Sequence, residues 1–178
     1  LVALAGLAVY AGAYNVAADS PHAAPVLALL DFVRERSIAV RAAGISVPPD
    51  LAAPERIAAG AGLYNEMCSG CHLGPGMERT EISQGLYPSA PAFNRDFKST
   101  PAEEFWAIKH GVKMTGMAAW GKTHSDELIW DMVAFLRKMP SLSAADYALA
   151  IKNAPRDHDE MMNDMKMDKK PALPMDDA

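Results

Sequence analysis

Apolar residues recur at helical spacing through the segment 51–153 and predict a domain that is almost entirely helical. The helix starts are marked by Pro54, by Ser99 or Thr100 before Pro101, by Ser125 and by Ser143. The predicted helices run over residues 54–68, 100–110, 125–139 and 143–152. The fold class expected from this pattern is all-α.

A long stretch without helical periodicity separates the first two of these helices. Residues 73–96 are punctuated by glycine and proline, and they are too polar and too interrupted for a strand. Connections of this length without structure of their own are uncommon in compact domains, so we expect this one to wrap around something.

The first eighteen residues are apolar and carry no charge, and Asn15 is the only one of them with a strongly polar side chain. This composition is typical of a membrane segment, and we interpret residues 1–20 as the outer part of an N-terminal transmembrane anchor. Tyr10 and Tyr14 suit an interfacial belt at its outer end. The alternative is the apolar region of a signal peptide that is later cleaved.

Residues 21–50 predict an amphipathic helix followed by a linker. Val26, Leu29, Leu30 and Val33 recur at helical spacing within residues 25–43, and charged residues occupy other positions. This helix could lie along a membrane surface, along a partner subunit or on its own domain. The linker is formed by residues 47–50, where two prolines end the pattern.

Composition narrows the class of protein. The chain has 178 residues, 50% of them hydrophobic, and a formal net charge of −5. The hydrophobic content excludes wholesale disorder. The net negative charge gives no positive electrostatic field that would attract the phosphates of a nucleic acid. The two cysteines, Cys68 and Cys71, are too few and too close together to form a disulfide framework, so we expect them to serve local chemistry.

Residues 68–72 have the sequence Cys-Ser-Gly-Cys-His, the C-x-x-C-H pattern of c-type haem attachment. Its two thiols can add to the two vinyl groups of one porphyrin, and the adjacent His72 can bind the iron. A redox C-x-x-C motif calls for a βαβ setting, which is not predicted, and a zinc site would need further ligands among scattered histidines. The expected cofactor is one covalent haem c.

The sixth iron ligand is expected in the segment after the second helix. We predict Met117 as this ligand, because its thioether suits haem iron and the preceding Gly116 lets the backbone approach the porphyrin face. Met114 is the alternative, although a methionine there more often fills an apolar gap. His110 and His124 flank a loop and a helix start, and we expect both to be solvated.

Taken with these motifs, the segment from Pro54 to Ala150 resembles class I cytochrome c. The resemblance is carried by CSGCH, by FWAIKHGVKMTGMAAWG (residues 105–121) and by the final amphipathic helix. It implies that Met117 is the distal ligand and that Trp120 lies beside the haem propionates. The family usually has proline after that methionine, and here Ala118 takes its place.

The resemblance has two further structural implications. The first and last helices of the domain should cross closely. The residues agree with this, because Gly62 offers bare backbone beside Tyr64, and the facing surface can be filled by Trp130, Val133 and Phe135. A proline carbonyl should orient His72 through its Nδ1–H. Pro75 is the nearest, Pro88 and Pro91 are alternatives, and the sequence does not decide among them.

The whole chain is similar to membrane-anchored mono-haem cytochromes c of the bacterial periplasm. This similarity implies a one-electron carrier on the outer face of the inner membrane, not itself an enzyme, whose partner is a membrane-bound redox complex. The alternative is a haem enzyme or gas-binding sensor in which Met117 is displaced. We expect the haem domain to span residues 51–153.

Two charged segments suggest contacts. Five bases around the Met117 loop outnumber three acids and could steer an acidic partner, or could form an ordinary solvated face; the bases are Arg95, Lys98, Lys109, Lys113 and Lys122 and the acids Asp96, Glu103 and Glu104. Residues 154–178 form a Met- and Asp-rich tail, which we interpret as flexible. Its methionines, with His158, are a composition that Cu(I) favours, although no ligand spacing is fixed.

Overall fold

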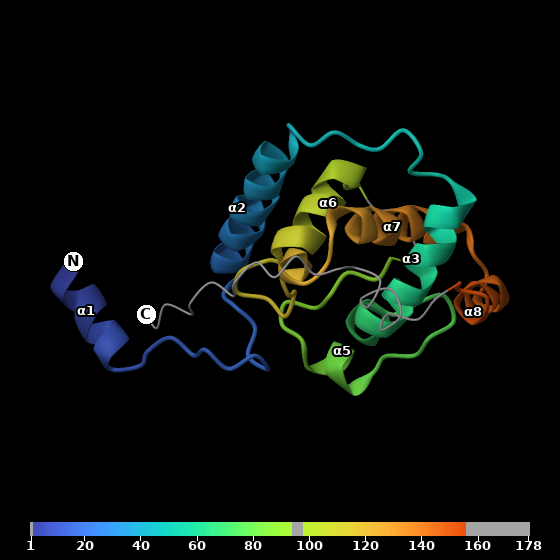
Figure 1. The fold of residues 1–178 in the computed structure, drawn as a ribbon. Helices are drawn as coiled ribbons and strands as arrows, with labels where there is room; N and C mark the ends of the chain where they lie inside the picture. The colour runs from blue at the N-terminus through green and yellow to red at the C-terminus, as the bar shows by residue number, and fades with distance from the viewer. Residues whose placement is uncertain (1, 94–97, 156–178) are drawn as a thin grey trace.

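The structure is a computed structural model that describes residues 2–93 and 98–155. Within these residues the chain forms helices and no strand, which confirms the all-α prediction (Figure 1). The α-helices are α1 (Val2–Tyr10), α2 (Ala24–Ala42), α3 (Pro54–Met67), α4 (Ser69–His72), α5 (Glu81–Gly85), α6 (Pro101–His110), α7 (Asp126–Lys138) and α8 (Ala144–Lys152). Two short 3-10 helices, η1 (Trp120–Lys122) and η2 (Met139–Ser141), flank α7.

The helix starts lie where the capping residues predicted them. Thr100 and Glu103 form a reciprocal capping box at the start of α6, and Ser143 and Asp146 form another at the start of α8. The Ser125 hydroxyl accepts a hydrogen bond from the Leu128 N–H and caps α7. The short helix α5 was not predicted, because five residues carry too little periodicity to be detected.

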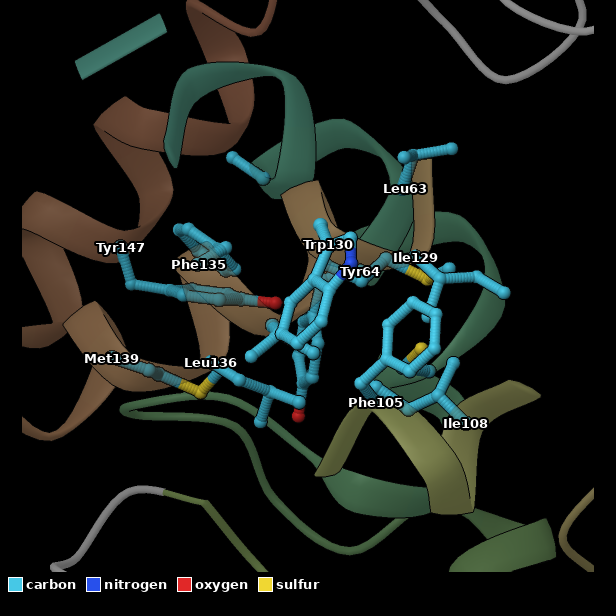
Figure 2. Close-up of a cluster of buried hydrophobic side chains, with 14 residues drawn as sticks. Leu63, Tyr64, Phe105, Ile108, Ile129, Trp130, Phe135, Leu136, Met139 and Tyr147 are labelled. Carbon is cyan, nitrogen blue, oxygen red and sulfur yellow. The ribbon is translucent and has the colours of Figure 1, made fainter. Parts of the chain in front are cut away.

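The core lies where α3 crosses α7. A Cβ atom added at Gly60 would lie 1.9 Å from the backbone oxygen of Asp131, so the two backbones touch at this point. Gly62, which we expected to offer bare backbone in this region, is also buried. Figure 2 shows aromatic and aliphatic side chains from α3, α6, α7 and α8 filling the space around it.

The helix α2 packs on α6 of its own domain (Figure 1). Ala42, at the end of α2, is 2% exposed. One side of α2 therefore packs on its own domain, which was one of the three predicted arrangements. Its other side is exposed.

The N-terminal apolar segment is only partly helical. The helix α1 ends at Tyr10, short of Ala18, and Gly12 follows with a φ of +63°. A residue with positive φ departs from the helical backbone, so the turn at Gly12 ends the helix. Among the residues that the structure describes, no helix has the length and apolar character needed to cross a membrane. The predicted anchor over residues 1–20 is thus not seen as one continuous helix.

Glu104 joins α6 to α7 through a small buried network. Its Oε1 accepts hydrogen bonds from the Ser99 hydroxyl at 2.9 Å and from the Arg137 guanidinium at 3.0 Å. Its Oε2 is buried without a hydrogen bond among the described residues. Burial raises the pKa of Glu104 to about 7, although Ser99 and Arg137 act in the opposite direction.

This network predicts a loss of stability as pH rises from about 4.5 to about 7. In that window the folded state still holds the proton on Glu104, whereas the unfolded state has released it, so raising the pH favours unfolding. The contribution is at most about 1.4 kcal/mol per pH unit. Replacing Glu104 by Gln should remove this decline. Guanidinium unfolding of both proteins across the window checks it, and identical pH slopes would contradict it.

Candidate functional site

The end of α3 and the one-turn helix α4 bring the C-x-x-C-H motif into a single turn. Cys68 closes α3, and its carbonyl accepts hydrogen bonds from the N–H groups of Cys71, at 3.1 Å, and His72, at 2.9 Å. Residues three and four apart in such a turn lie on one side of it. Cys68 is buried and Cys71 is half-buried, and both are free thiols. The turn therefore presents two thiols and one imidazole together.

The ring of His72 is held from two directions. Its Nδ1 lies 2.8 Å from the Pro91 carbonyl oxygen, and the Phe93 ring stacks on it with centroids 4.7 Å apart and an angle of 22° between the ring planes. Of the three prolines considered, Pro91 is the one that makes this contact. Burial lowers the pKa of His72, which favours the neutral imidazole that a metal needs.

The segment 73–93 leaves α4 and returns to the His72 ring, which confirms that it wraps around this part of the domain. It begins at Leu73, whose φ of 60° is unusual for a residue with a side chain. The Tyr64 hydroxyl donates a 2.5 Å hydrogen bond to the Leu73 carbonyl oxygen. The chain then passes Gly74, where an added Cβ would lie 2.4 Å from the Tyr147 ring. Tyr64 and Tyr147 are thus supports that sequence patterns did not reveal.

A compact hydrogen-bonded turn holds Met117. The Val112 N–H donates to the Met117 carbonyl at 3.2 Å, and the Thr115 hydroxyl donates to the Val112 carbonyl at 2.8 Å. The Met117 N–H donates to Thr115 Oγ1 at 3.0 Å. Gly111 opens the turn with a φ of +64°, and an added Cβ would lie 2.7 Å from the Met117 oxygen. The Met117 side chain is half-buried and packs against the core.

The wrapping segment and the Met117 turn approach each other at Gly116. A Cβ atom added there would lie 2.6 Å from Cδ2 of Leu86. Gly116 therefore lets the Met117 turn come close to the Leu86 side chain of the wrapping segment, residues 73–93. Its effect is to bring the segment that supports His72 next to the segment that carries Met117.

The alternative ligands differ in their surroundings. Met114 is 75% exposed, and its backbone has a φ of 60°. His110 is exposed, as expected. His124 was expected to be solvated, but it is only 6% exposed, with its Nδ1 2.8 Å from the Thr123 hydroxyl and the Trp120 ring edge-on to it.

The chemistry of these donors fits a covalently attached haem, because it comprises two free thiols, an imidazole with a fixed ring and a thioether held against the core. The model of a family described as cytochrome C oxidase, cbb3-type, subunit III matches residues 55–136. Residues 55–136 are a class I c-type cytochrome domain. No curated protein and no solved structure matches the chain significantly.

The cytochrome domain binds a covalent c-type haem, and its general function is electron transfer. Trp120 opens η1 next to the Met117 turn and is half-buried against the core. The roles of the individual residues that would hold the haem remain predictions.

Charges around the Met117 turn of the cytochrome domain are partly internal. Glu104 is buried against Arg137, and Lys109 pairs with Asp126 at 2.5 Å, so neither is a free surface charge. The bases Lys98, Lys113 and Lys122 are exposed. Arg95 and Asp96 lie outside the described residues, as do residues 156–178 with the proposed copper ligands. Within the described part of the chain, no three His, Cys, Asp or Glu residues form a metal-binding group.

Proposed function

We propose that the chain is a one-electron carrier whose haem c is attached through Cys68 and Cys71 and ligated by His72 and Met117. When bound, the haem supplies an iron that cycles between Fe(III) and Fe(II). The protein contributes the attachment, the two axial ligands and their supports. We assign Trp120 to the surroundings of the haem, as the resemblance implies.

The contact between His72 and Pro91 carries this proposal. Because the Pro91 carbonyl engages Nδ1, the other ring nitrogen, Nε2, is the one that can bind iron. The carbonyl also fixes the ring orientation and makes the imidazole a stronger donor. Phe93 closes one side of the ring and limits its rotation. A histidine supported in this way is suited to permanent ligation.

The contrast between the two methionines supports Met117 as the second ligand. The Met117 turn is closed by three hydrogen bonds and its side chain faces the core, whereas the Met114 side chain is exposed. A sulfur held near the core before iron binds loses little conformational entropy when it ligates. Two protein ligands saturate the iron and leave no position for oxygen or peroxide, so this arrangement favours electron transfer over catalysis.

The location and the partner belong to the same proposal. Haem of the c type is expected outside the bacterial cytoplasm, which places the predicted haem domain, residues 51–153, in the periplasm. We assign residues 1–20 to a membrane tether because α1 carries no charge and is exposed along its length. The expected partner is a membrane-bound redox complex. The exposed bases Lys98, Lys113 and Lys122 could meet its acidic surface.

Carbon monoxide tests the proposal. The reduced full-length protein should show an unchanged absorption spectrum under carbon monoxide, because both axial positions are filled by the protein. Isolated haem in the same buffer, which binds the gas, is the positive control. A spectrum that shifts would indicate an open or easily opened position. That result would favour the haem enzyme or gas sensor.

A further inference from the structure

One side of α2 carries apolar side chains that are exposed to solvent. Leu29 and Phe32 are each 62% exposed, Val33 is 53% exposed and Val40 is 61% exposed. Leu29, Val33 and Val40 follow each other at helical spacing, so they lie along one side of the helix. We call the set Leu29, Phe32, Val33, Arg36 and Val40 the outer stripe.

The opposite side of α2 is fixed to the cytochrome domain. It packs on α6, and Ala42 is buried at its end (Figure 1). Just before α2, the His22 N–H donates a 2.8 Å hydrogen bond to the Tyr87 hydroxyl, and the two rings meet edge-on with centroids 5.2 Å apart. Tyr87 belongs to the segment that wraps around His72. The outer stripe therefore points in a constant direction relative to the domain.

The charges on α2 are unevenly distributed around its axis. Arg36 follows Val33 by three residues and precedes Val40 by four, so it lies within the outer stripe. Asp31 falls on another side of the helix, where it pairs with Arg34 at 2.7 Å, and Glu35 lies just outside the edge of the stripe, three residues after Phe32. The stripe thus combines exposed apolar side chains with a cation and no acid. An apolar layer edged by anionic groups is its complement.

The helix α1, which precedes α2 in the chain, is also suited to an apolar environment. Its nine residues carry no charge, and Val2, Leu4, Leu7 and Val9 are all exposed. In Figure 1, α1 and α2 lie at the same end of the molecule, and α6 lies on the inner side of α2. A helix that is apolar on all sides is stable in an apolar environment. One bilayer could cover both α1 and the outer stripe of α2.

We propose that the outer stripe of α2 lies in the interface of a membrane that contains anionic lipids. The cytochrome domain then rests on the bilayer, with α2 between the lipid and α6. This inference rests on the proposed membrane tether and adds the surface by which the domain is oriented. Because α6 leads into the Met117 turn, contact at α2 determines how that turn faces relative to the membrane.

Site-directed spin labelling of the full-length protein tests the proposal. Single cysteines replace Leu29, Val33 or Val40, and the Glu35→Cys variant is the matched control outside the stripe on the same helix. Each haem-loaded variant is labelled with a nitroxide in vesicles of phosphatidylcholine and phosphatidylglycerol. Collision rates are then measured with oxygen, which concentrates in lipid, and with a nickel chelate, which stays in water. A label in place of Leu7 reports on the tether.

We expect the oxygen-to-nickel ratio at the three stripe positions to exceed that at position 35 several-fold. Equal ratios would overturn the proposal, because the stripe would then face water. Protection from both reagents would also overturn it, because the stripe would then be covered by protein. If Leu7→Cys reports lipid while the stripe reports water, the tether stands and this inference fails. If Leu7→Cys reports water, the proposed tether fails.

The role of Arg36 gives a second measurement. In vesicles of phosphatidylcholine alone, the ratios at the stripe should fall, because the cation has lost its anionic complement. The Arg36→Gln variant in mixed vesicles should show the same fall, with an unchanged haem spectrum. Ratios that do not respond to either change would contradict the requirement for anionic lipid.

Discussion

Replacing Met117 by alanine is expected to lower the reduction potential of the haem by on the order of 0.1 V, within the roughly 0.8 V range that axial ligands control. The thioether stabilises Fe(II) selectively, so its loss favours Fe(III). The same substitution should open the iron to carbon monoxide. Redox titration and absorption spectra of the reduced variant measure the two effects.

Met114→Ala is the matched control for this experiment. Met114 is three residues away in the same turn, but its side chain is 75% exposed. The variant should keep the absorption band of the ferric iron bonded to a thioether, and its potential should stay near that of the unmodified protein. If Met114→Ala removes the band and Met117→Ala keeps it, the ligand is Met114. If neither matters, His110 or His124 becomes the candidate.

Gly60→Ala is expected to destabilise the folded protein by about 3 kcal/mol or more, a large value for a single added methyl group. The added Cβ would lie 1.9 Å from the backbone oxygen of Asp131 and 2.9 Å from Cβ of Phe135. Neither neighbour is the end of a flexible side chain, so α3 and α7 must move apart. Guanidinium unfolding of the haem-loaded variant measures the loss.

The control for crowding is Gly44→Ala. Gly44 follows α2, and a Cβ added there meets nothing within 4 Å. This variant should stay within about 0.5 kcal/mol of the unmodified protein, as surface substitutions usually do. If both variants lost the same stability, the close approach of α3 and α7 would not explain the effect of Gly60→Ala.

Features encoded by neighbouring residues could be predicted from the sequence. The capping residues Thr100, Ser125 and Ser143 placed the starts of α6, α7 and α8, because a cap acts on N–H groups two or three residues away. The haem attachment motif was equally clear, because both thiols and the imidazole fall within five residues. The haem and the all-helical fold are confirmed. The individual ligands stay predictions.

Features that depend on distant residues were decided by the tertiary structure. His72 could have been oriented by Pro75, Pro88 or Pro91, and Pro91, nineteen residues away, makes the contact. The close approach of α3 and α7 at Gly60 likewise depends on how the helices pack. No local pattern encodes these contacts, because their free energy arises only when segments far apart in the chain exclude water from the same space.

The helix α2 shows in one element both what the sequence determined and what the tertiary structure decided. By itself the sequence determined that residues 25–43 form a helix with apolar and charged positions, because helical periodicity is a local property. Which apolar residues are covered was decided only by packing on α6, which leaves Leu29, Phe32, Val33 and Val40 outside. The physical reason is that one helix offers several apolar sides, and the shape of its neighbour selects the one that is buried.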